Sequence, residues 1–198
     1  ATGRELVRLM LKSEKWNTIT IVIRRKLPEW ENIDPNKLII LQKENLDLLS
    51  ENDVSSYFPN TYDSVFCCLG SRVGRGKHEF EKVDYTYVIN SAELCEKLKI
   101  PHFSLVSSKG ADSKSFFYYF KTKGRADEEV MKKNVENISI YRPGALLERD
   151  NDCRFGEKVL KFIPFIPKIK CDDLMRVVMD DAEHIHDQKR SGKLIIEH

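Results

Sequence analysis

Residues 103–124 read Phe103-Ser-Leu-Val-Ser-Ser-Lys-Gly-Ala-Asp-Ser-Lys-Ser-Phe-Phe-Tyr-Tyr-Phe-Lys-Thr-Lys123-Gly124. The first part is apolar and favours a β-strand, which ends in the serine pair Ser107-Ser108. The second part places Tyr119 and Lys123 four residues apart, a spacing that puts two side chains on one face of a helix. A strand-end hydroxyl, a phenol and an ammonium that lie close together form a candidate proton-transfer site.

Strands and helices alternate along the rest of the chain. The β-branched run 18–23 predicts a buried parallel strand, and a helix precedes it from the first turn to about Trp16. Further elements are expected, as strands at 38–41, 64–69, 102–107, 138–141 and 193–197 and as helices at 79–98, 121–133 and 172–187. This order predicts an α/β fold, a doubly wound parallel sheet (Rossmann fold) with helices on both faces.

We expect a single domain over residues 1–198, in which residues 145–198 form a small C-terminal extension on the substrate side. The turn at Ala1 already enters a helix, so we expect that a strand ending in glycine precedes it. In open α/β sheets, ligands bind at the carboxyl ends of the strands. Candidate residues follow those ends, namely Gly3, Arg24, Arg25, Gly70, Ser107 and Ser108.

Composition argues against several classes of protein. A net charge of +2 over 198 residues does not favour a nucleic-acid binder. No apolar run reaches the length of about 18 residues that a membrane span requires. The five cysteines are odd in number and lack the spacing of metal ligands, which indicates reduced thiols. We therefore expect a cytoplasmic location, extending to the nucleus, and we expect no metal site.

Two segments suit the phosphates of a dinucleotide. The turn Ala1–Glu5 at a helix start offers free amides and the helix dipole, although it could equally be an ordinary turn. Arg24 and Arg25 directly follow the strand that ends at the adenosine ribose in such folds. An acidic residue there binds the 2′-hydroxyl of NAD, whereas arginine accommodates the 2′-phosphate of NADP. The arginine pair favours NADP(H), and a solvated basic strand end is the alternative.

Tyr119 and Lys123 suit general acid–base chemistry. A neighbouring ammonium favours the ionised form of a phenol, which brings proton exchange closer to neutral pH. The same ammonium could hold ribose hydroxyls, and Ser108, or Ser107 if the strand register differs, could bind the reacting oxygen. The simpler alternative is that Tyr119 is a packed aromatic residue and Lys123 is solvated.

Six ordered segments resemble one known group of proteins. The chain resembles the atypical short-chain dehydrogenase/reductase superfamily, and within it the Tat-interactive-protein-like oxidoreductases. The resemblance covers nearly the whole chain. It rests on Ala1-Thr-Gly, Ile23-Arg-Arg-Lys-Leu, Phe66-Cys-Cys-Leu-Gly70, Ser107-Ser-Lys-Gly-Ala-Asp112, Tyr119-x-x-x-Lys123-Gly and Tyr141-Arg-Pro-Gly-Ala-Leu-Leu147.

This resemblance implies an NAD(P)-binding Rossmann domain and assigns roles to single residues. It places Arg24 and Arg25 at the 2′-phosphate, and it makes Tyr119 the proton donor or acceptor with Lys123 in support. Further cofactor contacts are implied at Thr2, Gly3, Arg4, Glu5, Asp47, Leu69, Gly70, Leu146 and Arg154. One departure is Leu6, which replaces the third glycine of the family's turn and could shift the first helix.

Two functional hypotheses follow. The first is an NADP(H)-dependent oxidoreductase that transfers hydride between nicotinamide and a small carbonyl or alcohol substrate. The second is an NADP(H)-binding regulatory or protein-interaction module with little turnover. The Tyr119/Lys123 pair favours the first hypothesis, whereas Leu6 and the short C-terminal region favour the second.

Overall fold

The computed structural model describes residues 1–50, 53–147 and 168–197. Its main strands run parallel in two ladders, one of order β2-β1 and one of order β3-β4-β5-β8. The bounds are β1 (Ile19–Ile23), β2 (Leu38–Gln42), β3 (Ser64–Cys67), β4 (His102–Val106), β5 (Asn137–Arg142) and β8 (Lys193–Glu197). A third, short parallel ladder joins β6 (Ala145–Leu147) to β7 (Lys168–Lys170).

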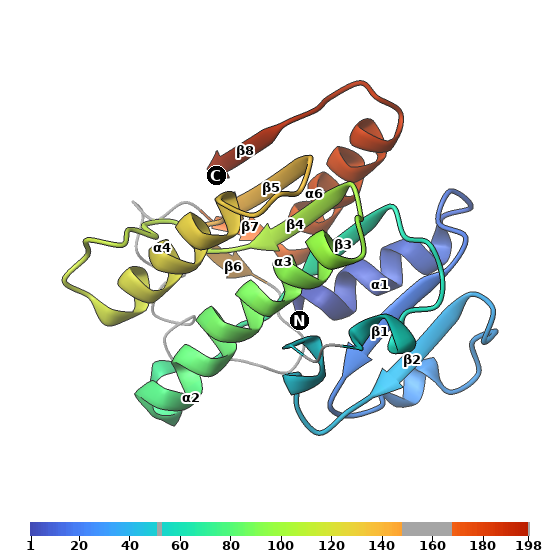
Figure 1. Cartoon of the computed structure of the whole chain (residues 1–198), viewed down its shortest axis with the longest axis horizontal. Helices are drawn as coiled ribbons and strands as arrows, with labels where there is room; N and C mark the ends of the chain where they lie inside the picture. The colour runs from blue at the N-terminus through green and yellow to red at the C-terminus, as the bar shows by residue number, and fades with distance from the viewer. Residues whose placement is uncertain (51–52, 148–167, 198) are drawn as a thin grey trace.

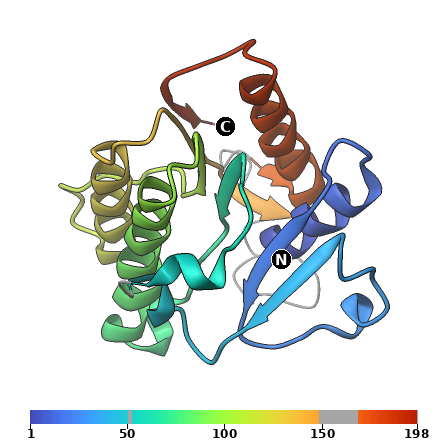
Figure 2. The same cartoon turned by 45° about the vertical axis from the view of Figure 1, so that its right-hand side comes forward.

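Helices cover both faces of the sheet. Figure 2 shows α1 (Thr2–Lys12) and α6 (Cys171–His186) on one side of the strands, with α3 (Tyr87–Lys97) and α4 (Tyr118–Met131) on the other (Figure 1). Parallel strands with helices on both faces confirm the predicted doubly wound α/β fold.

Each face has its own apolar core. Leu6 and Met10 of α1 pack with Met175 and Val178 of α6 in one buried cluster. On the other face, α3 and α4 contribute Val88, Ala92, Ala126 and Val130 to a second cluster. All five residues of β4 are buried, which matches a central parallel strand covered on both sides. The carboxyl ends of the strands therefore lie between two packed helix layers.

Two predicted helices differ from the structure in ways that matter for the site. The helix expected from Lys121 begins at Tyr118, because Phe117 is still extended, with ψ at 119°. The helix expected over 79–98 is divided into α2 (Lys77–Glu81), a π-helical segment η5 (Lys82–Thr86) and α3. The apolar stripe continues through this break, so its period alone does not reveal the π-turn.

The first helix is shorter than expected, whereas the helix and the strand expected near the C-terminus are confirmed. α1 ends at Lys12 rather than near Trp16, because Ser13 is extended. Residues 171–197 form α6 and β8, which belong to the helix layer and the main sheet. The single-domain assignment and the strand expected before Ala1 remain predictions. Among the described residues, no helix has the length and hydropathy that crossing a membrane requires.

Candidate active site

A cavity opens where the carboxyl ends of β3 and β4 meet the start of α1 and the first turns of α4. Its volume is about 150 Å³. The lining combines strand ends, helix starts and the short strand β6, and consists of Ala1, Thr2, Cys68, Leu69, Gly70, Ser71, Asp84, Val106, Ser107, Tyr119, Lys123 and Leu146.

The cavity gathers seven of the residues predicted from the sequence, although they span positions 2 to 146. They are Thr2, Leu69, Gly70, Ser107, Tyr119, Lys123 and Leu146. Of the two candidate serines, Ser107 lines the cavity, whereas the Ser108 hydroxyl donates to the carbonyl of Lys109 at 3.2 Å. The geometry therefore favours Ser107 as the hydroxyl that faces a ligand.

Lys123 is held by a carboxylate that sequence reasoning missed. Its Nζ lies 2.8 Å from Oδ1 of Asp84, and the two side chains are 5% and 1% exposed. Burial lowers the pKa of Lys123, but the Asp84 carboxylate and Tyr119 more than offset this effect, so that the pKa is raised overall. The ammonium is therefore charged at neutral pH although it is buried.

A signal for Asp84 is present in the sequence. The residue lies four positions after Phe80 and four before Val88, both of which are fully buried. An acidic residue on the apolar stripe of a helix is unusual and indicates a buried partner. The partner is distant in sequence, and the π-turn changes the direction of the side chain, so spacing alone could not identify Lys123.

The two adjacent tyrosines have different surroundings. The Tyr119 ring packs against Phe80 at 5.6 Å between centroids and lines the cavity. The Tyr118 hydroxyl instead donates to Glu81 at 3.2 Å, on α2. Tyr119 is therefore both packed, as the simpler alternative proposed, and placed at the cavity with Lys123.

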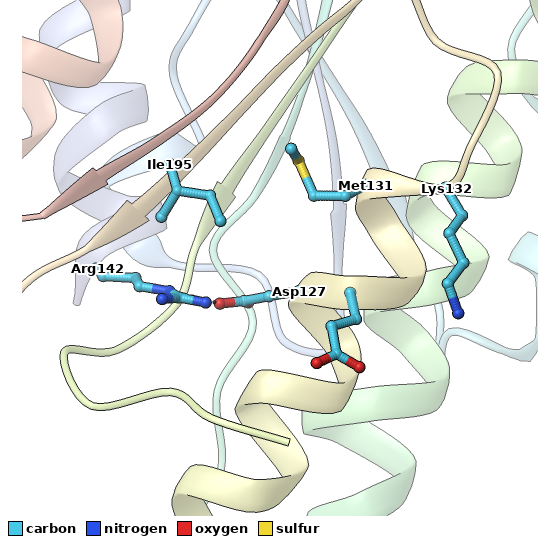
Figure 3. Close-up of a pocket in the computed structure, with 6 residues that line it drawn as sticks. Asp127, Met131, Lys132, Arg142 and Ile195 are labelled. Carbon is cyan, nitrogen blue, oxygen red and sulfur yellow. Dashed lines mark hydrogen bonds and ion pairs between the residues drawn. The ribbon is translucent and has the colours of Figure 1, made fainter. Parts of the chain in front are cut away.

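A second buried carboxylate, Asp127, lies one turn after Lys123 on α4. Its Oδ2 accepts from Nε of Arg142 at 2.9 Å, as Figure 3 shows. Burial raises the pKa of Asp127, and Ser107, Arg142 and Lys123 oppose this rise. This ion pair borders a separate cavity of about 260 Å³ between α4 and the strands β5 and β8.

Gly124 allows a loop to lie directly on α4 beside the site. A Cβ atom at this position would lie 2.2 Å from the backbone nitrogen of Ser113. The loop that joins β4 to α4 thus passes over the helix where the helix has no side chain. Steric contact with this loop therefore explains why glycine follows Lys123, which the sequence pattern alone did not explain.

The arginine pair and Asp47 do not line the cavity. Arg24 and Arg25 are exposed directly after β1. Asp47 accepts from Lys82 at 3.1 Å and from the hydroxyl of Tyr87 at 2.9 Å, and these contacts lower its pKa. Their predicted contacts with the adenosine end of a cofactor remain predictions.

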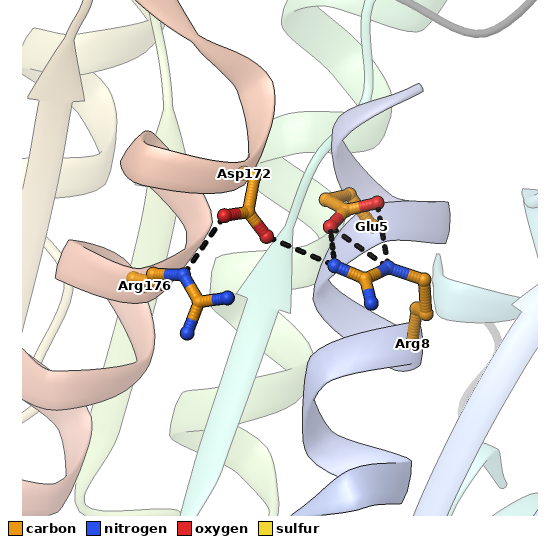
Figure 4. Close-up of polar contacts among 4 residues, drawn as sticks. All are labelled: Glu5, Arg8, Asp172 and Arg176. Atoms are coloured by element: carbon orange, nitrogen blue, oxygen red, sulfur yellow. Dashed lines mark hydrogen bonds and ion pairs between the residues drawn. The ribbon is translucent and has the colours of Figure 1, made fainter.

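The first turn of α1 is tied to its neighbours by close packing and by ion pairs. A Cβ atom on Gly3 would lie 3.3 Å from Cβ of Cys68, and Arg4 pairs with Glu29. Figure 4 shows Glu5 bound to Arg8, whose guanidinium also reaches Asp172 of α6 at 2.9 Å.

The remaining predicted residues behave differently. Leu6 is buried in the core between α1 and α6. Arg154 lies outside the described residues. Within the described ranges, no group of three or more histidine, cysteine or acidic side chains could hold a metal ion.

The cavity fits part of a dinucleotide. The amide ends of α1 and the side-chain-free Gly70 border it, and a helix N-terminus favours a phosphate. The buried Oγ of Ser71 has no hydrogen-bond partner among the described residues, so it is available to a ligand. Together with the doubly wound fold, these features define a nucleotide-binding protein of the Rossmann class.

Comparison with known proteins identifies the family. A model of NAD(P)H-binding domains matches residues 1–167, and the chain belongs to this family. The rat protein HTATIP2 is 34% identical over 168 residues, which is 84% of this chain and 67% of the relative. This relationship confirms the resemblance to the Tat-interactive-protein-like group. The Candida albicans protein FMP52, named as mitochondrial, is 28% identical over 209 residues, 98% of this chain and 89% of the relative.

Solved structures share the fold at low sequence identity. MoeE5, solved with UDP-glucose and NAD, has a TM-score of 0.73 at 14% identity and is covered to 72% by this whole chain. The UDP-glucose 4-epimerase of Thermotoga maritima, solved with UDP-glucose, has a TM-score of 0.70 at 13% identity and is covered to 73%. These likenesses show the fold alone.

Proposed function

We propose that this protein is an NADP(H)-dependent oxidoreductase of the short-chain dehydrogenase/reductase type, acting on a small carbonyl or alcohol substrate. One observation carries the proposal. A single cavity is lined by the α1 start, by Gly70 and by the Ser107, Tyr119 and Lys123 side chains. The groups that we propose for cofactor binding and for proton transfer are far apart in sequence, yet they line the same cavity.

Each residue has a defined part in this reaction. Bound NADPH supplies the hydride. The Tyr119 phenol donates a proton to the substrate carbonyl oxygen, and the Ser107 hydroxyl donates a hydrogen bond to the same oxygen. The Lys123 ammonium holds ribose hydroxyls and stabilises the phenolate that proton donation leaves behind. In the reverse direction, the phenolate removes the proton from an alcohol.

The choice of NADP(H) over NAD(H) rests on Arg24 and Arg25. Both guanidinium groups are exposed at the carboxyl end of β1, where they can bind a 2′-phosphate bidentately. Titration with NADPH and NADH tests this choice. The double variant Arg24→Ala/Arg25→Ala is expected to bind NADPH about 10- to 100-fold more weakly and NADH almost unchanged.

A charge-matched control makes this titration specific. Lys12→Ala/Lys97→Ala removes two exposed charges at the far ends of α1 and α3, and is expected to leave both affinities unchanged. Equal NADPH and NADH affinity in the wild type would contradict the cofactor choice. Failure to bind either dinucleotide would contradict the proposed function itself.

The proposed location is the cytoplasm. The fungal relatives that carry the word mitochondrial in their names provide the competing location. Fluorescence of the tagged protein in cells, imaged with a mitochondrial marker, decides between them. Overlap with the marker would contradict the cytoplasmic proposal.

A further inference from the structure

Asp84 joins two parts of the site through its two carboxylate oxygens. Oδ1 lies 2.8 Å from Nζ of Lys123, and Oδ2 accepts the backbone N–H of Ser71 at 2.7 Å. Ser71 directly follows Gly70, where the dinucleotide is expected to pass. One buried carboxylate thus connects the loop after β3 with the lysine of the proton-transfer pair.

The π-helical segment places Asp84 in this position. Segment η5 (Lys82–Thr86) separates α2 from α3, and Asp84 is its one buried residue. π-Turns within helices often occur at functional sites, because they redirect a side chain at a cost in helix stability. Here the redirected side chain is a carboxylate that reaches the site.

Asp84 is the main charge available to compensate Lys123. The charged and titratable groups facing the ammonium are Asp84 from η5, Cys67 from β3, and Tyr119 and Asp127 on α4 itself. Asp127 is already paired with Arg142, and burial raises the pKa of the Cys67 thiol, which keeps it neutral. A buried ammonium without a carboxylate partner tends to lose its proton.

We propose that Asp84 is a positioning residue that keeps the Lys123 ammonium charged and fixed beside Tyr119. The kinetic part of this inference rests on the proposed oxidoreductase function, whereas the electrostatic part does not. Asp84 touches no reacting atom in this scheme and acts through Lys123. Its contact with the Ser71 amide fixes the same carboxylate to the cofactor loop.

The Asp84→Asn variant tests the proposal through a pH profile. Asparagine can still accept the Ser71 N–H, but it cannot compensate the ammonium. We expect carbonyl reduction by the variant to lie within a few-fold of wild type near pH 6 and to fall at least about tenfold by about pH 9, as Lys123 loses its proton. Wild type is expected to lack this fall. An Asp84→Glu variant, which restores the charge, is expected to remove it.

Unfolding measurements test the same proposal without turnover. If Lys123 is neutral in folded Asp84→Asn and charged when unfolded, the unfolded state binds one more proton. The unfolding free energy of the variant then rises with pH up to about 10.4, the ordinary lysine value. Wild type is expected to lack this rise, because the pKa of its Lys123 is raised. The variant thus gains stability over the pH range in which it loses activity.

A double variant separates the charge effect from a general loss of packing. Asp84→Asn/Lys123→Met removes both charges, and we expect it to be more stable than Asp84→Asn at neutral pH and to lose the pH-dependent rise. A parallel pH dependence of stability in wild type and Asp84→Asn would overturn the proposal. If wild type reduces no carbonyl compound, the proposed function fails, and the unfolding measurements still decide the role of Asp84.

Discussion

The two ends of the parallel sheet both carry buried polar groups, but these groups are organised differently. At the carboxyl ends, Lys123 and Asp84 border a cavity, and Ser71 Oγ has no hydrogen-bond partner in the part of the chain that the structure describes. At the amino ends, His102 of β4 lies between two hydroxyls, Ser64 Oγ at 2.9 Å and Ser139 Oγ at 3.1 Å. Burial of polar groups alone therefore does not mark a functional site; an adjoining cavity and an available donor do.

The hydrogen bonds around His102 at the amino ends of the strands form a network, and they fix which groups in it donate and which accept. The Ser139 hydroxyl donates to Asp181 at 2.6 Å, so it must accept from His102 Nε2. Because burial lowers the pKa of His102 to about 4, its imidazole is neutral near pH 7, and Nδ1 accepts from the Ser64 hydroxyl. Asp181 is further bound by the Tyr141 hydroxyl at 2.7 Å and by Arg190 at 2.7 Å. These contacts join β3, β4, β5 and α6, which indicates a structural role.

The largest expected effect is at the amino end. Asp181→Ala removes the carboxylate that pairs with the largely buried Arg190 guanidinium and accepts from two hydroxyls, and is expected to lower the unfolding free energy by about 3–5 kcal/mol. NADPH affinity of the folded protein is expected to stay within about twofold of wild type, since the site is at the opposite end. Denaturant unfolding and NADPH titration measure the two quantities. If Asp181→Ala lost much of its NADPH affinity but kept the unfolding free energy of wild type, the amino end would be the functional end of the sheet, contrary to this account.

Low pH is expected to destabilise the protein through the same hydrogen-bond network around His102. Burial lowers the pKa of His102 to about 4, and Asp181 and Arg190 act in opposite directions on it. Between about pH 6.5 and 4 the unfolded state binds the extra proton, so stability falls as the pH falls, by about 3 kcal/mol in total. The unfolding free energy measured in urea is expected to fall with falling pH across this range in wild type. In His102→Gln this pH dependence is expected to disappear. An unchanged slope in the variant would assign the acid sensitivity to other groups.

The Gly124→Ala variant tests the close contact between α4 and the preceding loop at the carboxyl end of the sheet. The added methyl group would lie 2.2 Å from the Ser113 backbone, so we expect a loss of about 1–3 kcal/mol in unfolding free energy together with lower turnover. Gly74→Ala is the matched control, because a Cβ atom there meets nothing within 4 Å. Its effect is expected to stay within about 0.5 kcal/mol. Equal stability of the two variants would show that the loop does not rest on α4.

The smallest effect is expected from the exposed ion pairs of α1 and α6. Asp172 binds Arg8 at 2.9 Å and Arg176 at 2.8 Å, and the Arg176 contact contributes most to its lowered pKa. Asp172→Asn is expected to cost about 0.2–1 kcal/mol, because solvent and salt screen such pairs. The contribution is present above about pH 4 and disappears as pH falls through the lowered pKa of Asp172. A larger cost in thermal unfolding, unaffected by salt, would indicate a buried network instead.

Sequence patterns predicted those features that depend on local spacing. β-Branched runs located the strands, and the four-residue spacing of Tyr119 and Lys123 placed both at the cavity. Asp84 was not predicted, because it depends on a π-turn and on a partner that is distant in the sequence. The choice between Ser107 and Ser108 required the strand register, which only the structure gives.

The most direct test of the proposed function compares two neighbouring tyrosines. NADPH oxidation is measured over a panel of small carbonyl compounds with wild type, Tyr119→Phe and Tyr118→Phe. Because Tyr119 lines the cavity and Tyr118 binds Glu81, we expect Tyr119→Phe to lose about 10²–10⁴-fold in turnover with NADPH affinity nearly intact. Tyr118→Phe is expected to retain most of the activity. Equal turnover by the two variants, or loss of NADPH binding in Tyr119→Phe, would contradict the assignment of Tyr119 as the proton donor.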